Sequence, residues 1–342
     1  MTQPLKPIKF GDLDVEKKSF ELLSKLDSYG QIHFDALVDE FVQCFTTYCK
    51  KIVRLQEAGK KNAIGYINFS LLKTNLLIRK HELRIDAYDE NWYLDRVECS
   101  GVYDVSQLYR WLDIFADHLE GTRRKYLGKL KFSQMQALIF DESDKYLIFV
   151  AELMRVAIKK AVKTAIYQKL KRHEVFVICI GEYQNTVDIL YKEDLTVKDA
   201  KVFGRYLEKE KDRAKPLNYE ICENLDLSKR DFSGINLMFS SFMGCDFTNT
   251  NLENSTLLMN NFKGATFKNT NLINSQLLDA DFSDAMLENI DFKNAKLKHI
   301  SFKNAKLINV KFNEALLVEQ VNFDGVTLIN TKIPQETAKL GT

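Results

Sequence analysis

The sequence has few of the residues that mark several common protein classes. Only 4 of its 342 residues are proline and only 6 are cysteine. No two cysteines have the C-x-x-C spacing of a redox or zinc motif, and so few do not make the disulfide framework of a small secreted domain. The net charge is only +2. Overall charge therefore predicts neither a nucleic-acid-binding protein nor an acidic tail.

Long apolar segments are also missing. The best apolar run, residues 146–153, is interrupted by Glu152 and is far shorter than the about 20 residues of a membrane-spanning helix. The first twelve residues are polar, contain Pro4 and Pro7, and lack an apolar core of signal-peptide length. We therefore predict a cytoplasmic protein with reduced cysteines and no membrane partner.

The prolines lie outside two long segments of the chain. Pro216 follows a charged run at residues 208–213 and precedes a complete change of sequence pattern. Because proline commonly interrupts regular structure, we place a domain boundary there. The expected organisation is a first domain at 8–215, a second at 217–333, and a short tail at 334–342.

The second segment repeats with a period of five. From Leu227 to Leu317 every fifth residue is Leu or Phe, 19 in succession, and the residue two places before each is usually small. Neither a helix nor a strand has this period, but a chain that turns a corner every five residues does. Four corners, and hence four repeats, then complete one coil. One residue is inserted near positions 319–320, and the pattern resumes at Phe323.

This pattern resembles the pentapeptide-repeat family, whose repeat reads A-[D/N]-[L/F]-x-x. Residues 280–284 (ADFSD) and 270–274 (TNLIN) match it. The resemblance covers roughly a third of the chain and implies a right-handed quadrilateral β-helix of about 5.5 coils. Comparison of every fourth repeat predicts one core column of leucines and one of phenylalanines. These columns contain Leu237, Leu257, Leu277, Leu297 and Leu317, and Phe242, Phe262, Phe282, Phe302 and Phe323.

Residues 8–215 have mostly helical apolar periodicity with several short strands, which predicts an α+β domain. We recognise no family in it. Its last helix, with Thr196 as cap, is expected to cover the first coil of the repeat segment. The helices are expected at about 34–55, 104–119, 143–170 and 197–213, and the strands at 67–71, 83–87, 175–180 and 187–191.

The sequence contains no nucleotide-binding, nucleophile-elbow or zinc-protease motif. We therefore predict no enzyme activity, catalytic residue, cofactor or metal. Cys49 precedes two lysines, which suggests a reactive thiol. It lies among the regularly spaced apolar residues of the predicted helix, however, and this favours a core position. A basic helix around Lys159 could bind phosphate groups. We favour the alternative that its cations form the solvent-exposed face of an amphipathic helix. One stretch combines acidic and aromatic residues, which could bind a divalent cation. We favour the interpretation that it is a polar loop. It contains Asp86, Tyr88, Asp89, Glu90, Trp92, Tyr93, Asp95 and Glu98.

Charge is unevenly spread along the repeat segment. Residues 217–292 carry 11 acidic and 4 basic side chains, whereas residues 293–342 carry 4 acidic and 8 basic ones. The uneven charge indicates either a solvated surface or a polarised surface that binds another protein. The candidate partner-binding residues are Lys293, Lys296, Lys298, Lys303, Lys306, Lys311, Asp279, Asp281, Asp284, Glu288 and Asp291.

Together these features predict a non-catalytic interaction or scaffold protein built on a rigid rod. Two alternatives stay open. Some members of the family are thought to imitate duplex DNA and bind the topoisomerase gyrase; otherwise, residues 8–215 form a ligand sensor or enzyme. We further expect a bacterial protein. An open solenoid end needs a cover, so we expect a homodimer through the C-terminal end of the β-helix, as in many dimeric members of the family, or else a cap formed by Pro334 and the tail alone. Direct nucleic-acid binding is not expected.

Overall fold

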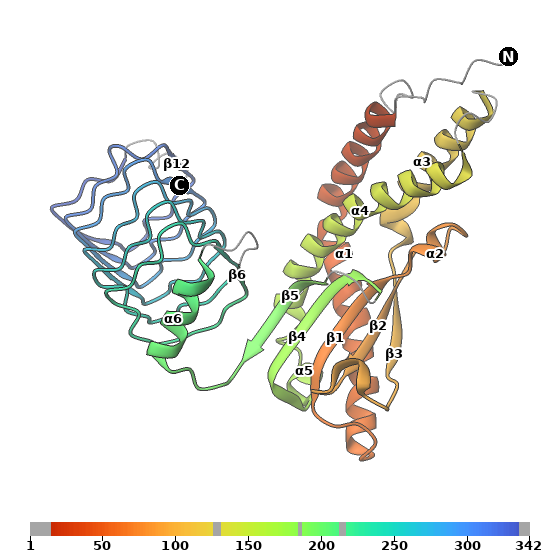
Figure 1. Cartoon of the computed structure of the whole chain (residues 1–342), viewed down its shortest axis with the longest axis horizontal. Helices are drawn as coiled ribbons and strands as arrows, with labels where there is room; N and C mark the ends of the chain where they lie inside the picture. The colour runs from red at the N-terminus through yellow and green to blue at the C-terminus, as the bar shows by residue number, and fades with distance from the viewer. Residues whose placement is uncertain (1–14, 126–130, 184–186, 212–216, 335–342) are drawn as a thin grey trace. The chain divides into compact units, whose positions relative to one another are not determined.

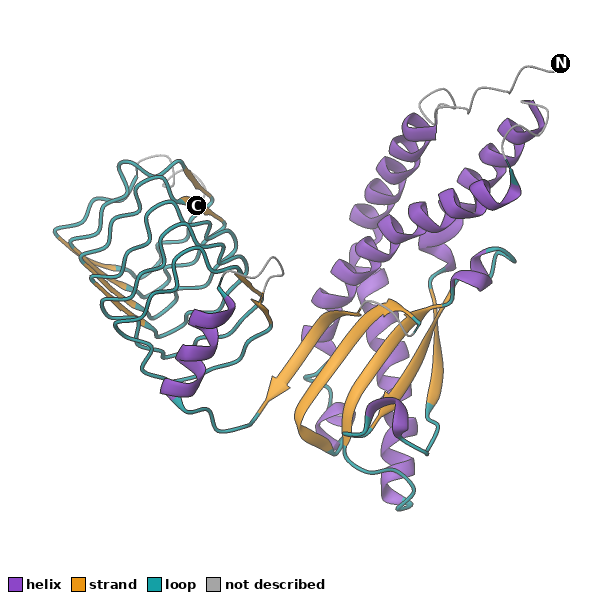
Figure 2. Ribbon diagram, in the orientation of Figure 1, coloured by secondary structure: helices purple, strands orange, loops and turns teal. Residues whose placement is uncertain are grey.

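The computed structural model describes residues 15–125, 131–183, 187–211 and 217–334 (Figure 1). The chain forms two compact units, Met1–Glu193 (unit 1) and Asp194–Thr342 (unit 2). Long helices and a sheet make up unit 1, whereas unit 2 is mostly short strands and turns (Figure 2). None of the helices within the described ranges combines the length and the apolar character needed to span a bilayer.

Unit 1 is an α+β domain around a five-stranded sheet of order β3-β2-β1-β4-β5. Strand β2 runs antiparallel to both β1 and β3, whereas β1 and β4 are parallel. A crossover through α3 and α4 therefore links β3 to β4. The elements are α1 (Val15–Glu57), β1 (Ile64–Leu71), α2 (Lys73–Leu76), β2 (Glu82–Tyr88), the 3-10 helix η2 (Trp92–Leu94), β3 (Ser100–Asp104), α3 (Ser106–Lys125), α4 (Phe132–Ala161), α5 (Ala165–Lys169), β4 (Arg172–Glu182) and β5 (Val187–Asp194).

Aromatic side chains of α1 build the core of unit 1 against the sheet. Phe41 and Phe45 lie one helical turn apart, so both point the same way. Their rings lie 5.6 and 6.3 Å from the ring of Phe69 in β1. Strand β1 is buried along nearly its whole length, as expected for a central strand covered by neighbours. The apolar spacing of residues 34–55 and 67–71 thus correctly predicts β1 and the part of α1 that follows its kink at His33, whereas the part that begins at Val15 was not predicted.

Two predicted helix starts are wrong. Helix α4 begins well before Ser143, which is buried inside it and donates its hydroxyl to the Phe140 carbonyl at 2.7 Å. Helix α6 (Ala200–Glu210) is capped by Asp199, whose carboxylate accepts from Val202 N at 2.8 Å. Thr196 is not its cap. Ser143 bonds the Phe140 carbonyl inside a helix, whereas Asp199 bonds the Val202 N–H at the start of one. The sequence alone does not show which polar residue makes the capping bond.

Unit 2 is a coil of parallel short strands in which each position meets its equivalent four repeats later. Asp226 pairs with Asp246, and such bridges recur every five residues, so that one coil has four pairing positions. The period predicted from the sequence is confirmed. The strands are β6 (Leu217–Asn218), β7 (Leu237–Met238), β8 (Thr266–Lys268), β9 (Met286–Glu288), β10 (Lys296–Lys298), β11 (Lys306–Ile308), β12 (Leu317–Glu319) and β13 (Thr327–Ile329).

The predicted phenylalanine column is present in the core of unit 2. Consecutive rings from Phe242 to Phe323 are stacked, with centroid separations of 5.7, 5.0, 5.4 and 5.5 Å. Leu237, Leu257, Leu277 and Leu297 are likewise buried. Identical side chains repeat at the spacing of the coils, so each layer fits the next without a change of shape.

The inserted residue lies earlier than predicted. Asp291 pairs with Lys311, its equivalent four repeats later, but Leu297 pairs with Val318, one position beyond its equivalent. The extra residue therefore lies between Lys311 and Leu317, not near positions 319–320. As a result Val318, not Leu317, continues the register of Leu297. The side chains of Leu317 and Val318 lie outside the described residues.

Helix α6 covers the first coil, as predicted, and so belongs to unit 2. Phe203 and Leu207 on its apolar side are part of the buried core of the coil. The division at Glu193–Asp194 therefore precedes the change of sequence pattern at Pro216, because α6 buries its apolar face against the repeats. Pro216 itself, and the tail beyond Pro334, lie outside the described residues.

Candidate functional site

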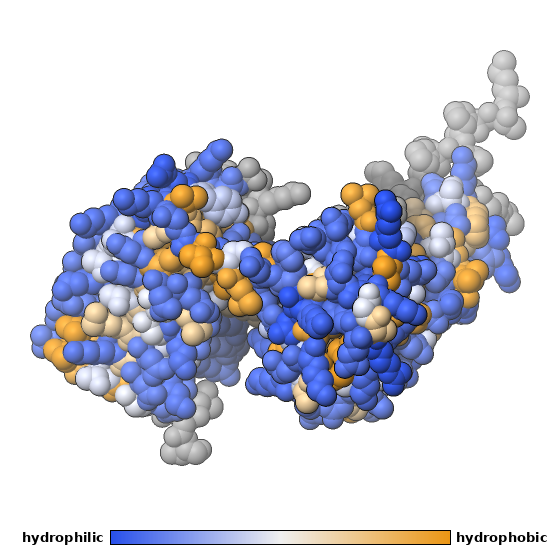
Figure 3. Space-filling model, turned by 90° about the horizontal axis from the view of Figure 1, so that it is seen from below, coloured by the Kyte–Doolittle hydropathy of each residue, from blue (hydrophilic) through white to orange (hydrophobic). Residues whose placement is uncertain are grey.

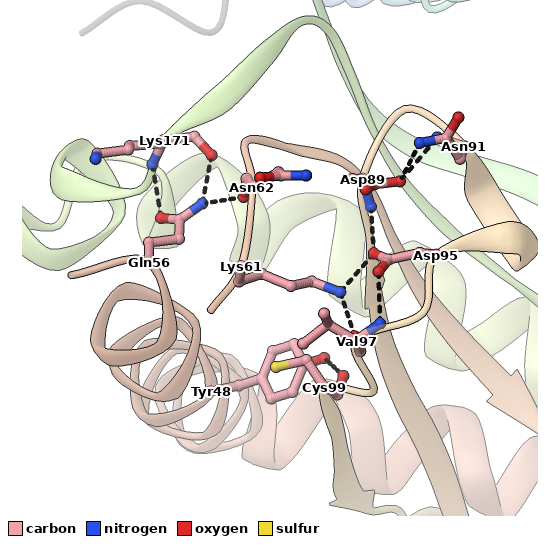
Figure 4. Close-up of polar contacts among 10 residues, drawn as sticks. All are labelled: Tyr48, Gln56, Lys61, Asn62, Asp89, Asn91, Asp95, Val97, Cys99 and Lys171. Atoms are coloured by element: carbon pink, nitrogen blue, oxygen red, sulfur yellow. Dashed lines mark hydrogen bonds and ion pairs between the residues drawn. The ribbon is translucent and has the colours of Figure 1, made fainter. Parts of the chain in front are cut away.

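The acidic stretch of unit 1 forms a loop between β2 and β3, and Asp95 holds it in place (Figure 4). The Asp95 carboxylate is almost fully buried and lies 2.5 Å from the Lys61 ammonium. It also accepts hydrogen bonds from the backbone N–H groups of Asp89 at 2.7 Å and Val97 at 2.9 Å. Burial raises the pKa of Asp95, but the hydrogen bonds from Lys61, Val97 and Asp89 outweigh burial and the pKa is lowered overall. Asp95 thus has a structural role.

The other acids of this loop also have partners inside the protein. Their contacts are Asp86 with Arg84 at 2.8 Å, Asp89 with Asn91 N at 2.9 Å, Glu90 with His173 at 3.1 Å and Glu98 with Arg84 at 3.2 Å. Trp92 packs on Tyr66, and the Tyr93 side chain lies outside the described residues. Across the parts of the chain that the structure describes, no group of three His, Cys, Asp or Glu side chains is placed to hold a metal ion. This arrangement supports the polar-loop interpretation.

Polar side chains of α1 fasten neighbouring segments in the same region. The Gln56 amide donates to the carbonyls of Asn62 and Lys171, both at 2.8 Å, and accepts from Lys171 N at 3.0 Å. The Tyr48 hydroxyl donates to the Cys99 carbonyl at 2.5 Å. These bonds satisfy loop backbone groups that would otherwise be buried without partners, and they account for the polar residues as structural ones.

A depression of about 670 Å³ lies between α1 and β3. Lys51 on its wall donates to the Ser100 carbonyl at 2.5 Å, and the Cys44 thiol contacts the Val102 carbonyl at 3.6 Å. These contacts occupy carbonyls of the edge strand β3. Burial raises the pKa of Cys44 to about 11 and that of Cys49 to about 12. Neither is a thiolate at neutral pH, so the reactive-thiol interpretation loses its chemical basis.

Two cations of the basic helix have ion-pair partners within unit 1. Arg155 is buried and lies 2.5 Å from Asp188 of β5. Lys160 pairs with Asp39 of α1 at 2.5 Å. Lys159 and Lys163, in contrast, are exposed and make no ion pair among the described residues, as in a solvated helix face. Pairing of Arg155 and Lys160 leaves fewer free cations on this helix for phosphate groups.

The corners of the coil in unit 2 use residues with left-handed backbone. The residue two places after each core position has a positive φ, for example 58° at Asn249 and 56° at Asn289. Asn adopts this conformation more readily than most residues because its short polar side chain bonds locally. The amides of Asn249, Asn269, Asn289 and Asn309 also form a ladder, with N···O distances of 3.2, 2.8 and 2.8 Å. Each corner is thus linked to the next coil.

The repeat pattern and this geometry agree with a comparison against protein families. The model described as pentapeptide repeats matches residues 221–257, 261–298 and 287–319. Residues 221–319 are pentapeptide repeats. The matched residues all lie in unit 2, which we now call the pentapeptide-repeat domain. No curated protein matches the chain.

Several solved pentapeptide-repeat structures are similar to parts of this chain. HetL, involved in heterocyst differentiation regulation in the cyanobacterium Nostoc sp. strain PCC 7120, is 14% identical, with a TM-score of 0.32, over 35% of this chain and 49% of that one. A protein of the Arabidopsis thaliana thylakoid lumen is 28% identical, with a TM-score of 0.20, over 30% and 61%. QnrB1, a plasmid-mediated fluoroquinolone resistance protein, is 15% identical, with a TM-score of 0.21, over 37% and 87%. The chain thus spans about half the length of HetL.

The predicted lysines do not share one surface of the pentapeptide-repeat domain. They flank successive core positions, and successive core positions occupy successive faces of the coil. Specifically, Lys293 follows Phe292, Lys296 and Lys298 flank Leu297, Lys303 follows Phe302, Lys306 precedes Leu307, and Lys311 precedes Phe312. The structure therefore distributes these cations around the rod instead of gathering them.

Most of the predicted charges are also paired between neighbouring coils. The pairs are Lys293–Glu314 at 3.1 Å, Lys298–Glu319 at 3.3 Å, Lys311–Asp291 at 3.8 Å, Lys263–Asp284 at 3.4 Å, Lys268–Glu288 at 3.1 Å and His299–Asp279 at 3.2 Å. Asp281 accepts from Ser283 N at 2.9 Å. Among described residues, Lys296, Lys303 and Lys306 make no ion pair. Exposed pairs contribute little stability, about 0–1 kcal/mol each, but they locally neutralise most of the candidate charges. Within the described residues, Glu223, Asp226, Asp246 and Glu253 of the acidic part make no ion pair.

One face of the domain is apolar on its outside, and sequence analysis missed it. This face follows Leu237, Leu257 and Leu277, and we call its outward residues Met238, Phe239, Leu258, Met259 and Leu278 the apolar stripe. Met259 is 46% exposed and the other four are half-buried. Most other side chains in the surface view of Figure 3 are hydrophilic. The available signal was the presence of Met, Leu and Phe at outward repeat positions that elsewhere hold Asn, Asp, Lys or Ser.

Proposed function

We propose that this chain is a non-catalytic interaction protein whose pentapeptide-repeat domain is a rigid, four-sided, right-handed rod that binds another protein. The observation that supports this proposal is that two sets of contacts stabilise the rod. Phe and Leu columns stack inside it, and asparagine ladders link its coils at the corners. A surface that is already ordered loses little conformational freedom on binding, so more of its contact energy appears as affinity.

In this proposal unit 1 contributes to partner choice and not to chemistry. Its acidic loop is held by the buried Lys61–Asp95 pair, and the thiols of Cys44 and Cys49 are protonated at neutral pH. The enzyme or ligand-sensor alternative rests mainly on the α1–β3 depression, which presents both cationic side chains and Glu40. We give it second place because Lys51 and Glu40 of this depression already bond to the Ser100 carbonyl and the Gln107 amide.

The gyrase-binding alternative requires a continuous acidic surface resembling the phosphates of DNA. Asp284, Glu288 and Asp291 are each paired with a lysine of a neighbouring coil. Paired carboxylates of this kind resemble a neutral ladder more than a phosphate backbone. The geometry therefore gives this alternative less support than general protein binding.

We further propose a homodimer through the C-terminal end of the rod. Strand β13 pairs on one side with β11, and Leu328 and Ile329 within it are 40% and 41% exposed. A depression of about 540 Å³ lies beside it, lined in part by Val310 and Phe312. A second copy would cover this end and satisfy the free strand edge. Analytical ultracentrifugation of wild type and Leu328→Lys tests this, with a monomeric wild type as the contrary result.

A photocrosslinking experiment tests the binding role. A photoreactive amino acid is introduced singly at Lys306, Lys293, Gln276 and Lys303, exposed residues on the four faces of the rod. We expect covalent capture of one protein from the native cells, in near-stoichiometric amount, from at least one face. Absence of capture from all four faces, with ligand-dependent stabilisation of unit 1, would instead favour the sensor alternative.

A further inference from the structure

We propose that the apolar stripe is the docking site for an amphipathic helix of the partner protein, oriented along the rod axis, with a carboxylate that meets Lys296. This inference rests on the proposed binding role and specifies the surface and the chemistry of the partner. The predicted charged residues on the other faces are not part of this site.

The backbone of the stripe is the first observation. Tyr219, Phe239 and Met259 occupy three successive coils at one corner with φ values of 60°, 57° and 56°. At the other corners this position is mostly Asn, Asp or Gly, which tolerate the left-handed region. Bulky side chains there are rare and unfavourable. Tyr219 is buried and Phe239 is half-buried, whereas Met259 is 46% exposed. A large apolar side chain at a strained and exposed position points to a use for that surface.

The stripe is also continuous between coils. Tyr219 N donates to the Met238 carbonyl at 3.0 Å, Phe239 N to Leu258 at 3.0 Å, and Met259 N to Leu278 at 2.8 Å. The rings of Tyr219 and Phe239 are stacked 5.1 Å apart. The apolar residues therefore form a column, one layer per coil.

The spacing of this column matches a helix. Adjacent strands lie about 4.8 Å apart, so Met238, Leu258 and Leu278 rise along the axis in steps of that size. Apolar residues separated alternately by three and four positions on a helix rise by about 5.3 Å per step. Over three coils the mismatch is only about 1 Å, so a helix with residues i, i+3 or i+4, and i+7 contacts every layer of the stripe.

The charge at the end of the stripe selects the partner further. In the next coil the same face changes to Lys296, Lys298 and His299. Lys298 pairs with Glu319 and His299 with Asp279, but Lys296 is exposed and makes no ion pair within residues 217–334. A helix whose apolar residues are followed one turn later by Glu or Asp thus complements the face in both hydrophobicity and charge.

Substitution of Met259 by Asn separates binding from folding. Asn is the residue that fits a left-handed corner, so Met259→Asn removes apolar surface while relieving backbone strain, and we expect an unchanged or higher melting temperature. With the photoreactive residue at Gln276, we expect Met259→Asn to reduce crosslink yield about tenfold or more, a loss typical of a central interface residue. The matched control Gly264→Met places the same apolar side chain at a left-handed corner of another face, where an added side chain meets no other atom, and should leave the yield unchanged.

Charge exchange tests the orientation. The crosslinked segment of the partner, identified by mass spectrometry, is synthesised and its affinity for the full chain is measured by fluorescence anisotropy. We expect this peptide to form a helix with one apolar face and an acidic end. The Lys296→Glu variant should bind it several-fold more weakly than wild type does. Replacement of the peptide carboxylate by Lys should restore binding to that variant.

The outcomes separate the two proposals. Capture from the Lys306, Lys293 or Lys303 positions but not from Gln276 overturns the docking site and leaves the general binding role intact. Capture from none of the four positions overturns both. A captured segment that is extended, or that lacks the acidic end, also overturns the helix proposal. Loss of crosslinking in Gly264→Met to the same extent as in Met259→Asn would show that neither effect is specific to the stripe.

Discussion

The two units of this protein reach a defined structure through opposite patterns of contact. In the pentapeptide-repeat domain each strand residue meets its equivalent in the next coil, layer after layer. In unit 1 the central pairing of Ile67 with Ile178 joins two segments that lie far apart in the sequence. Repeats propagate order between neighbours, whereas a sheet closed by a long crossover forms only when distant segments meet.

This difference predicts how far the destabilising effect of a substitution spreads through each unit. Damage in the repeat domain is confined to a layer and the coils next to it, whereas damage in unit 1 reaches the whole unit. Both tryptophans, Trp92 and Trp111, lie in unit 1. Tryptophan fluorescence therefore reports unfolding of unit 1 alone, and hydrogen exchange of the backbone reports the coils separately.

The largest effect is expected from breaking the buried ion pair of unit 1. Lys61→Met leaves the Asp95 carboxylate buried without its counter-ion, which should cost about 3–5 kcal/mol of stability. Denaturant unfolding followed by tryptophan fluorescence measures this loss. The double variant Lys61→Met with Asp95→Asn removes both charges but keeps an amide oxygen that can accept from the Asp89 or Val97 N–H group, so it should be much less damaging. Equal loss in the single and double variants would show that the charges are not coupled.

A slightly smaller and more local effect is expected in the repeat core. Leu277→Ala creates a cavity in a fully buried leucine column, at a cost of about 2–5 kcal/mol. Exchange protection should fall most in the coils containing Leu257 and Leu297, while the tryptophan transition of unit 1 stays in place. A uniform fall in both units would contradict the independence of their cores.

Acid should destabilise unit 1 through Asp95. Its pKa in the folded state lies below the ordinary value of 3.8, so ionised Asp95 stabilises the fold above that value and the contribution is lost as pH falls through the folded pKa. Asp95→Asn should remove this part of the acid sensitivity seen by tryptophan fluorescence. Asp231 in the repeat domain, with a pKa of about 2 set by Lys211, Ser233 and nearby charges, is exposed and should contribute little. An unchanged acid profile in Asp95→Asn would count against the pair.

The corner ladder should make a smaller contribution that two substitutions resolve. Asn289→Gly keeps a residue suited to its φ of 56° but removes the amide hydrogen bonds to Asn269 and Asn309. Asn289→Ala removes the same bonds and adds a left-handed penalty of about 1 kcal/mol. Thermal unfolding followed by far-UV circular dichroism should therefore rank Ala below Gly, and both below wild type. A Gly variant that melts at a lower temperature than the Ala variant would show that the left-handed penalty of alanine at this corner is negligible.

The smallest stability effect is expected for Met259→Asn. Loss of some apolar contact is offset by a residue that accepts the left-handed corner, so the change in unfolding free energy should stay within about 1 kcal/mol of zero. Differential scanning calorimetry checks this value before any binding assay. A larger destabilisation would indicate that Met259 supports the fold and not a partner.

The sequence predicted much of the repeat domain because its information is local and redundant. The period of five, the phenylalanine column and the covering role of α6 all appear in the residue pattern. The inserted residue was misplaced, because the stretch from Asn313 to Leu316 preserves an acceptable pattern in either register. In unit 1, predicted strands such as β1 were correct, but β3 and the start of α4 were missed, since tertiary contacts there override local signals.

The candidate surface shows the same limit. Charged side chains are conspicuous in a sequence, yet their pairing between coils depends on which residues stand one coil apart. The apolar stripe is inconspicuous in a sequence already rich in Leu and Phe. The period of five places Leu258 and Met259 outward and Leu257 inward, but the stripe appears only when the coils are stacked and these residues line up with Met238 and Leu278.

By itself the sequence determined the coil, because a strict period repeated through neighbouring layers admits one way to bury its large residues. Only the tertiary structure decided which polar groups are occupied and which surfaces stay available. The Lys61–Asp95 pair joins residues from different loops, whereas Lys296 forms no ion pair with the described residues around it on the rod. Such contacts follow from proximity in space, which residues distant in the chain acquire only after the core has formed.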